Sequence, residues 1–354
     1  MKIGIFDPYL DDIGGGERYM MTIASCLSQK NSVDVFWDSP KDLRKIEERF
    51  SLNLSKVNLV PNIFDPFFSV KKKLVKSREY DAIVFLSDGS IPFLLSKKLF
   101  IHIQRPIVEI SITFKDKMKL KRVDKVFVNS EFTKKYVDKV YLVDSQLLYP
   151  PVSIFGNTKK KENMILHVGR FRVLNVNAKD YKKQQVMIDT FKDLVDKGLK
   201  NWKFILAVSL PDIKDPNFVF MQDSTKGYPI EFLINSSNEK LWEVGSKAKI
   251  YWHASGFGED LEKHPELAEH FGISTVEAMG VGAVPVVINA GGQKEIIKDG
   301  ENGFLWNSIS EFEKKTLKLI DDEKLWTKLS DAAFQRSKYF SEDKFYDRVI
   351  ELIK

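Results

Sequence analysis

The sequence predicts an α/β protein with two Rossmann-like domains, each built on a parallel sheet. Three observations support this fold class. Short β-rich runs alternate with helical patterns along the whole chain. A proline-containing linker at residues 149–152 divides the series into two similar halves. The 354 residues also exceed what one ordinary hydrophobic core accommodates. We therefore expect two α/β domains that face a central cleft.

The strands expected in the first half are residues 2–6, 33–37, 82–86, 99–103, 125–129 and 147–149. Pro150 and Pro151 then stop both a helix and a central strand. The strands expected in the second half are residues 164–168, 203–208, 231–234, 250–253, 284–288 and 304–306. The pattern at residues 341–353 is that of an amphipathic helix. The expected domains are residues 1–150 and 151–338, with a terminal helical segment at 339–354.

Composition points to a globular protein of a reducing compartment. The chain is 43% hydrophobic and 29% charged, and its single cysteine, Cys26, excludes an internal disulfide. Residues 1–7 have the pattern of a buried strand and not of a signal peptide. No apolar run approaches the roughly 20 residues that span a bilayer. We expect a cytoplasmic protein, either soluble or peripheral at the membrane.

Positive charge gathers in the first half of a chain whose net charge is +6. Six bases stand against two acids between residues 115 and 125: Lys115, Lys117, Lys119, Lys121, Arg122 and Lys125. This run is either a solvated helix face or a surface that contacts anionic lipid, at about 1 kcal/mol per base. No nucleic-acid-binding motif accompanies the charge, so we expect no nucleic-acid partner.

Residues 269–279 are the most informative segment. Glu269 and Glu277 flank a glycine turn that begins a helix, and the apolar strand 284–288 follows. A helix N-terminus offers amides and a positive dipole end to an anion, and carboxylates accept hydrogen bonds from hydroxyls. This combination suits a nucleotide sugar. The alternative is structural, because Ser274-x-x-Glu277 is also the pattern of a capping box.

The segment resembles the Glu-x7-Glu motif of family 4 retaining glycosyltransferases, which have the GT-B fold. Further segments match that family in the same order: residues 129–133, 148–152, 167–171, 291–295 and 302–304. The resemblance implies transfer of a sugar from a UDP- or GDP-sugar donor to a hydroxyl acceptor, a glycan or lipid-linked glycan, with retention of configuration. The first domain would bind the acceptor and the second the donor, and the terminal segment would cross back to the first. No metal or other cofactor is expected, and the chain has no Asp-x-Asp motif.

The same resemblance assigns roles on the donor side. Arg170, at a strand end, and Lys182, at the start of the helix predicted for residues 181–196, would bind the diphosphate. Lys183 is adjacent and could take the role of Lys182. Glu277 would hold the ribose hydroxyls and Glu269 the hydroxyls of the transferred sugar.

The amides of Phe271, Gly272 and Ile273 would meet the phosphate or sugar, and a Cβ at residue 272 would obstruct that approach.

His102, at the end of a strand, matches a family histidine near the transferred sugar and reaction centre. The alternative is a core histidine bonded to a backbone carbonyl. His253 ends another strand and is a similar candidate.

A glycine-rich turn at residues 14–16 precedes a predicted helix. Gly15 and Gly16 would face the donor phosphates and the acceptor, or the turn is only structural. The turn does not complete the dinucleotide fingerprint, because Tyr19 stands where the third glycine belongs; Asp38, ending the second strand, is the one feature that favours NAD.

Two rival functions stay open: a noncatalytic nucleotide-sugar-binding protein and an NAD-dependent oxidoreductase. His264, Glu266 and His270 fit no established metal-ligand spacing. Residues 256–266 form a charged insertion relative to many family members. It either shapes a pocket or is a simple insertion.

Overall fold

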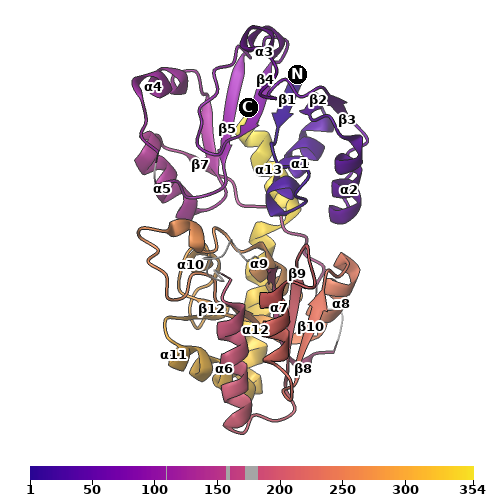
Figure 1. Cartoon of the computed structure of the whole chain (residues 1–354), viewed down its shortest axis with the longest axis vertical. Helices are drawn as coiled ribbons and strands as arrows, with labels where there is room; N and C mark the ends of the chain where they lie inside the picture. Colours follow the sequence, from indigo (N-terminus) through magenta and orange to yellow (C-terminus); the bar gives the residue numbers. More distant parts are fainter. Residues whose placement is uncertain (109, 157–159, 172–181) are drawn as a thin grey trace. The chain divides into compact units, whose positions relative to one another are not determined.

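The computed structural model describes residues 1–108, 110–156, 160–171 and 182–354, and it divides into two compact units (Figure 1). Unit 1 comprises Met1–Pro151 together with Glu342–Lys354, and unit 2 comprises Val152–Ser341. Each unit is an open sheet of parallel strands flanked by helices. Among the described residues, no helix combines the length and the apolar character that a bilayer crossing requires.

Unit 1 contains seven strands in the order β3-β2-β1-β4-β5-β6-β7, all parallel. Its strands are β1 (Lys2–Phe6), β2 (Ser32–Phe36), β3 (Val57–Val60), β4 (Ala82–Leu86), β5 (Lys98–Ile103), β6 (Lys125–Val128) and β7 (Gln146–Leu147). Its helices are α1 (Gly15–Ser28), α2 (Pro40–Phe50), α3 (Val70–Ser77), α4 (Phe114–Leu120), α5 (Glu131–Tyr141) and α13 (Glu342–Ile353). Strand β3 lies at the edge of the sheet and was not predicted.

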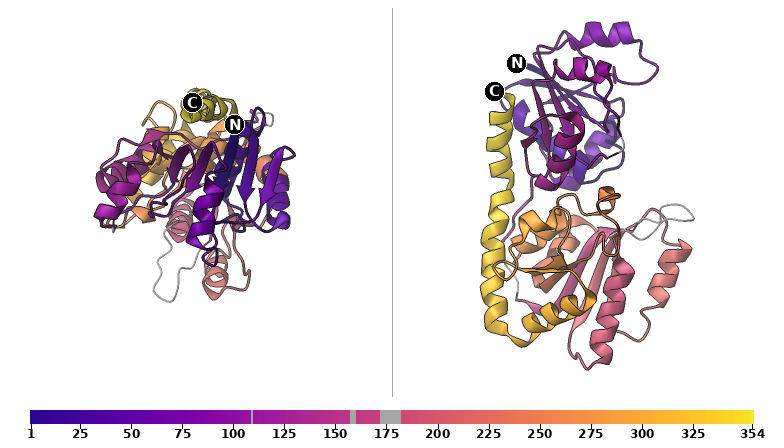
Figure 2. Two further views of the ribbon diagram at one scale, coloured as in Figure 1. Left: turned by 90° about the horizontal axis from the view of Figure 1, so that it is seen from above. Right: turned by 90° about the vertical axis from the view of Figure 1, so that its left-hand side faces the viewer.

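Helices cover both faces of the sheet of unit 1. Alternate strand residues such as Ile3 and Ile5 pack with α1 and α13 in one cluster, which includes Phe345 and Val349. The other face packs against α5 through Val137 and its neighbours. Figure 2 shows α13, coloured yellow, lying beside this sheet. The terminal helix therefore belongs to the core of the unit that contains the N-terminus.

Unit 2 contains six parallel strands in the order β10-β9-β8-β11-β12-β13. Its strands are β8 (Glu162–Arg170), β9 (Lys203–Ser209), β10 (Ile230–Ile234), β11 (Ala248–His253), β12 (Val284–Ile288) and β13 (Phe304–Trp306). Its helices are α6 (Gln184–Asp196), α7 (Pro216–Asp223), α8 (Asn238–Lys247), η1 (Pro265–Leu267), α9 (Ile273–Gly280), α10 (Gln293–Ile296), α11 (Ile309–Asp321), α12 (Glu323–Ser337) and η2 (Lys338–Phe340).

Both sheets reverse their strand order at one place. In unit 1 the chain moves outward from β1 in one direction and from β4 in the other, and in unit 2 the same reversal separates β8 from β11. Ligands of open α/β sheets bind at the carboxyl ends of the strands beside this switch point. The strand order alone therefore places a candidate site of unit 2 at the ends of β8 and β11.

Candidate functional site

Two predicted residues stand at the switch point of unit 2. Arg170 is the last residue of β8 and His253 the last residue of β11. These two strands are hydrogen-bonded neighbours. The carboxyl ends of these two strands are thus adjacent.

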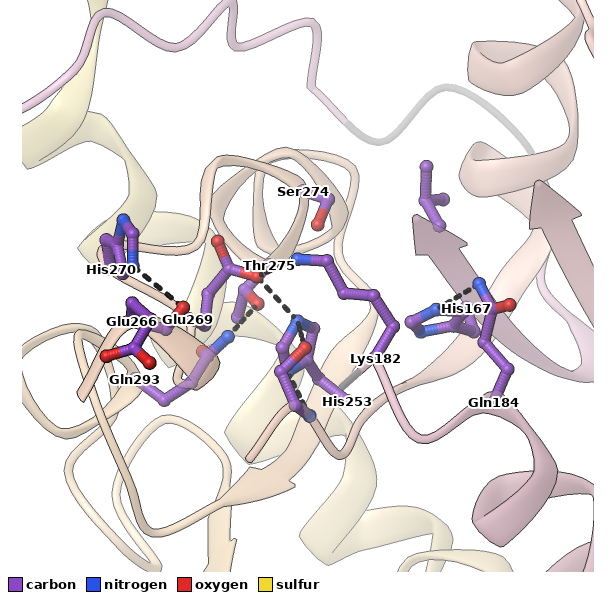
Figure 3. A network of polar contacts seen from close by, with 12 residues as sticks. His167, Lys182, Gln184, His253, Glu266, Glu269, His270, Ser274, Thr275 and Gln293 are labelled. Atoms are coloured by element: carbon purple, nitrogen blue, oxygen red, sulfur yellow. Dashed lines mark hydrogen bonds and ion pairs between the residues drawn. The ribbon is translucent and has the colours of Figure 1, made fainter. Parts of the chain in front are cut away.

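Two side chains from other parts of the sequence, those of Lys182 and His253, converge on the carboxylate of Glu269 (Figure 3). Lys182 Nζ donates to Glu269 Oε2 at 2.7 Å, and His253 Nε2 lies 3.0 Å from the same oxygen. The Lys182 and Glu269 side chains are 17% and 20% exposed, whereas His253 is 1% exposed. The structure therefore brings a predicted phosphate-binding lysine and a predicted sugar-binding acid into one ion pair.

The hydrogen bonds of this cluster define its charges. The amide of Ser255 donates to His253 Nδ1 at 3.4 Å, so His253 Nε2 carries the proton that it donates to Glu269. Burial lowers the pKa of His253, which stays neutral near pH 7. Burial alone would raise the pKa of Glu269, but the Lys182 ammonium and the His253 donor outweigh it, and the pKa is held well below its ordinary value. Glu269 is therefore a carboxylate beside a cation and a neutral imidazole.

A pair of glycines holds the backbone of Glu269 in place. The amide of Gly292 donates to the Glu269 carbonyl at 2.8 Å. A Cβ at Gly291, whose φ is +57°, would lie 2.2 Å from that carbonyl oxygen, and a Cβ at Gly292 would lie 2.4 Å from the Cα of Phe271. Glycine is required at both positions because backbone meets backbone there. The family-like segment at residues 291–295 thus positions Glu269.

The start of α9 corrects two interpretations of the sequence. The helix begins at Ile273 with Gly272 as its N-cap, so Ser274 is inside the first turn and the capping-box reading of Ser274 and Glu277 is wrong. Gly272 has a φ of +120°, and a Cβ there would lie 2.9 Å from Gln293 Nε2. Glycine at 272 is therefore explained by backbone conformation and packing, without a ligand.

Tyr251 contacts the first turn of α9, a contact that was not predicted from the sequence. Its buried hydroxyl lies 2.8 Å from Ser274 Oγ and 3.4 Å from the carbonyl of Val168. Burial raises the pKa of Tyr251, and the negative charges of Glu269 and Glu277 raise it further. Tyr251 alternates with His253 along β11, but nothing local in the sequence marks its contacts.

The two adjacent lysines have different partners. Lys182 reaches Glu269, whereas Lys183 Nζ lies 2.6 Å from Glu259 Oε1 in the inserted segment. The structure therefore gives each lysine its own acid, while the choice of diphosphate ligand between them stays a prediction. The predicted long loop at residues 172–180 lies outside the described residues, and α6 is described from Gln184.

The glycine turn of unit 1 has a clear structural explanation. Gly14 is the N-cap of α1, and its amide donates to the carboxylate of Glu17 at 2.5 Å. Gly15 and Gly16 are the first two residues of α1, and a Cβ at Gly16 would lie 2.5 Å from Gln104 Oε1. These contacts account for the turn, while the predicted ligand role of Gly15 and Gly16 stays a prediction.

His102 lies in the core of unit 1. It is 0% exposed, its ring stacks on Tyr19 with 4.3 Å between centroids, and its Nδ1 lies 3.2 Å from the Phe127 carbonyl. Burial lowers the pKa of His102 to about 3, so it stays neutral. This is the geometry of the core alternative. The catalytic role of His102 stays a prediction, although its side chain has no exposed surface in this conformation.

The two features that bear on NAD binding are also structural. Tyr19, in the place of the third glycine, is 2% exposed and donates to the Leu148 carbonyl at 2.9 Å. Asp38 accepts a hydrogen bond from the amide of Asn62 at 3.1 Å. An aromatic core residue, Tyr19, thus occupies the position at which the dinucleotide fingerprint has its third glycine.

The possible metal cluster does not form. His264 Nδ1 lies 3.2 Å from Glu266 Oε1, but His270 Nε2 contacts the carbonyl of Glu266. Within the described part of the chain, no group of three or more His, Cys, Asp or Glu side chains could hold a metal ion.

The chain is similar to curated mannosyltransferases. It is 27% identical to the GDP-Man:Man(3)GlcNAc(2)-PP-Dol alpha-1,2-mannosyltransferase of Dictyostelium discoideum, over 79% of this chain and 55% of the relative. The Neurospora crassa enzyme of the same name is 24% identical, over 66% of this chain and 45% of the relative. The chain thus spans about half the length of these curated relatives.

Solved structures match the whole chain. The crystal structure of Anabaena HepE in complex with UDP has a TM-score of 0.75 at 18% identity, covering 100% of this chain and 99% of HepE. A glycosyltransferase from Rickettsia africae has a TM-score of 0.73 at 16% identity, covering 99% of this chain and 97% of that protein. These similarities show the fold, and the predicted GT-B fold is confirmed.

The site described above lies in the part of the chain that a family model matches. The model, described as glycosyl transferases group 1, matches residues 153–336, which is more than half of the chain. Arg170, Lys182, Glu269 and Glu277 all fall within the match. The predicted glycosyltransferase family is confirmed, and the chain belongs to the glycosyl transferases group 1 family.

Proposed function

We propose that the protein is a retaining glycosyltransferase that takes its sugar from a nucleotide-sugar donor bound by unit 2. The observation that carries the proposal is the convergence of Lys182, His253 and Glu269 beside the start of α9. A cation next to a helix start suits a diphosphate, and an ionised acid held by a neutral donor suits sugar hydroxyls. Family membership supports the same reading.

In the proposed reaction, the bond between the anomeric carbon and the leaving phosphate oxygen breaks. The nucleoside diphosphate gains negative charge, which Arg170, Lys182 and the amides of Phe271, Gly272 and Ile273 would stabilise. Preorganised groups of this kind typically supply several kcal/mol. The acceptor hydroxyl attacks from the same face and passes its proton to the leaving diphosphate, which retains the configuration. Glu269 would orient the transferred sugar and Glu277 the ribose.

We propose a glycan or lipid-linked glycan as the acceptor, bound by unit 1. Support comes from the names of the curated relatives, which act on a glycan attached to dolichyl diphosphate. The donor would be a GDP- or UDP-sugar: the same relatives use GDP-mannose, and HepE was crystallised with UDP.

A binding screen followed by a transfer assay tests the proposal. The melting temperature of the purified protein would be measured with UDP-, GDP- and ADP-sugars, and binding of the correct donor would raise it. Donor turnover would then be followed as release of the nucleoside diphosphate, with and without glycan acceptors. Binding without turnover would favour the noncatalytic alternative. Neither binding nor turnover with any donor would contradict the proposal.

We further propose that unit 1 contacts an anionic membrane through α4. This helix has no buried residue, and Phe114 and Met118, one turn apart, are 78% and 48% exposed among lysines. Apolar anchors within a basic helix suit lipid head groups. Lys125 is not part of this surface, because its ammonium donates to the Leu352 carbonyl at 2.7 Å.

Sedimentation with liposomes tests the membrane contact. The protein should sediment with anionic vesicles and not with zwitterionic ones, and the double variant Phe114→Ser with Met118→Ser should lose most of the binding. Equal sedimentation of the variant and the wild type would contradict a role for α4.

A further inference from the structure

The inserted segment between β11 and Glu269 is built as an ordered loop. Within it, the amide of Glu259 donates to the Gly256 carbonyl at 3.1 Å and the amide of His264 to the Asp260 carbonyl at 2.8 Å. The ring of Phe257 packs 5.2 Å from that of Trp306. The His253–Glu269 hydrogen bond joins its two ends. The loop is therefore anchored at both ends and in the middle.

One acid of this loop is enclosed while its neighbours are not. The side chain of Glu259 is 5% exposed and pairs with Lys183, which is 15% exposed, at 2.6 Å. Asp260 is next in sequence, yet its side chain is 49% exposed. A carboxylate taken out of water is costly unless a partner cation compensates for the loss of hydration. Glu259 and Lys183 therefore each need the opposite charge of the other to remain enclosed.

Lys183 holds an unusual backbone conformation. It is the N-cap of α6, with φ 55° and ψ 39°, and its side chain makes no capping hydrogen bond. A residue with a Cβ adopts this left-handed region at a cost of about 1 kcal/mol or more. The surrounding contacts must therefore over-determine this conformation, and the ion pair with Glu259 is the contact that the Lys183 side chain supplies.

The left-handed turn sends two successive lysines to two different acids. Lys182 points to Glu269 and Lys183 to Glu259, and both acids belong to the same stretch of chain. The Lys183–Glu259 pair fixes the backbone from which Lys182 extends. If that pair is lost, the backbone of the turn can relax, and the position from which the Lys182 side chain extends is no longer fixed.

We propose that Glu259 is a positioning residue for the donor diphosphate, acting through Lys183 to aim Lys182. This inference rests on the proposed function of the site and gives the inserted loop a role in it. The ligand class concerned is a nucleoside diphosphate, and the effect is specific to its phosphates. The nucleoside itself does not depend on this turn.

The test compares UDP and GDP with uridine and guanosine, using calorimetry for the diphosphates and ligand-observed NMR for the nucleosides. Glu259→Ala and Lys183→Met should each weaken binding of the preferred nucleoside diphosphate by about tenfold, with nucleoside binding unchanged. The double variant should bind as each single variant does, because both remove one interaction. Lys183→Arg, which keeps the positive charge, should bind the diphosphate like the wild type. Asp260→Ala, in the same loop, should do so too.

Melting temperatures of all variants show whether they fold. If Glu259→Ala does not fold, Glu259→Gln, which keeps an acceptor for Lys183, is measured in its place. Equal weakening of nucleoside and diphosphate binding would mean that Glu259 only supports the structure and would overturn the inference. So would wild-type diphosphate affinity in Glu259→Ala. If the wild-type protein binds neither UDP nor GDP, the proposed function fails and this inference fails with it.

Discussion

Replacing Glu269 by glutamine separates the two roles proposed for its carboxylate. One is to hold the Lys182 ammonium, and the other is to accept hydrogen bonds from the sugar hydroxyls. In the described state, Glu269 holds the ammonium that we assign to the diphosphate. Glutamine keeps nearly the same shape and still accepts the hydrogen bond from His253, but it carries no charge. Lys182 is then released for a phosphate. The acceptor for sugar hydroxyls is weakened at the same time.

The size of the effect follows from the exposure of the pair. Exposed ion pairs contribute about 0.2 to 1 kcal/mol, and hydrogen bonds to charged groups contribute about 1.5 to 3 kcal/mol. With side chains 17% and 20% exposed, the Lys182–Glu269 pair lies between these cases, at about 1 to 2 kcal/mol. Glu269→Gln should therefore bind the nucleoside diphosphate about 5- to 30-fold more tightly than the wild type. It should bind the complete nucleotide sugar more weakly.

Isothermal titration of both ligands against both proteins measures these opposite changes. Glu266→Gln is the control, since Glu266 is also near the site but its side chain is 46% exposed and pairs with His264. The control should leave both affinities unchanged. The reasoning is refuted if Glu269→Gln binds the nucleoside diphosphate as the wild type does or more weakly, because Lys182 would then not be released by loss of the charge.

Three further outcomes are expected. In Lys182→Met, the pKa of Glu269 should rise because the ammonium that lowers it is gone, so the variant should regain stability relative to the wild type as the pH falls. Urea unfolding at each pH measures this, and a constant difference would contradict the assigned charges. Gly292→Ala should lower the free energy of unfolding by about 1 to 3 kcal/mol and weaken donor binding, since its Cβ would meet the Phe271 backbone. Gly245 lies inside α8, and a Cβ there would be 3.7 Å from its nearest neighbour, so Gly245→Ala should instead stabilise the protein by about 0.5 to 1 kcal/mol. Equal effects of the two substitutions would contradict the packing argument. Burial raises the pKa of the Cys26 thiol to about 11, so a thiol reagent at about pH 8 should modify Cys26 only after unfolding, and rapid labelling of the native protein would show that Cys26 is accessible.

Hydrophobic pattern was sufficient to predict the parallel sheets. Buried parallel strands have continuous apolar runs, and the runs at residues 82–86 and 284–288 became β4 and β12 unchanged. Strand β3 was missed because Val57–Val60 is short and lies at an edge, where its residues are only partly buried or exposed. A half-exposed edge strand does not carry a strong apolar signal.

The site was predicted only in part, because its contacts cross long stretches of sequence. The family resemblance assigned roles to Lys182 and Glu269 separately, but their 2.7 Å contact joins residues 87 positions apart. The contact between Tyr251 and Ser274 likewise joins residues 23 positions apart. The capping-box reading failed for a different reason: the spacing fits, but the conformation of Gly272 starts the helix earlier. Backbone torsion angles of that kind are not encoded in residue spacing.

The path of the chain through unit 2 has a consequence for protein engineering. Val152 and Ser341 form a parallel β-bridge, and the Val152 amide donates to the Phe340 carbonyl at 3.0 Å. The entry and exit of this unit are therefore adjacent, and residues 152–341 form a closed cassette. Such a cassette can be circularly permuted with a short linker, or exchanged between scaffolds, without pulling its two ends apart. Exchange of this unit between relatives could thus proceed by replacing one contiguous gene segment.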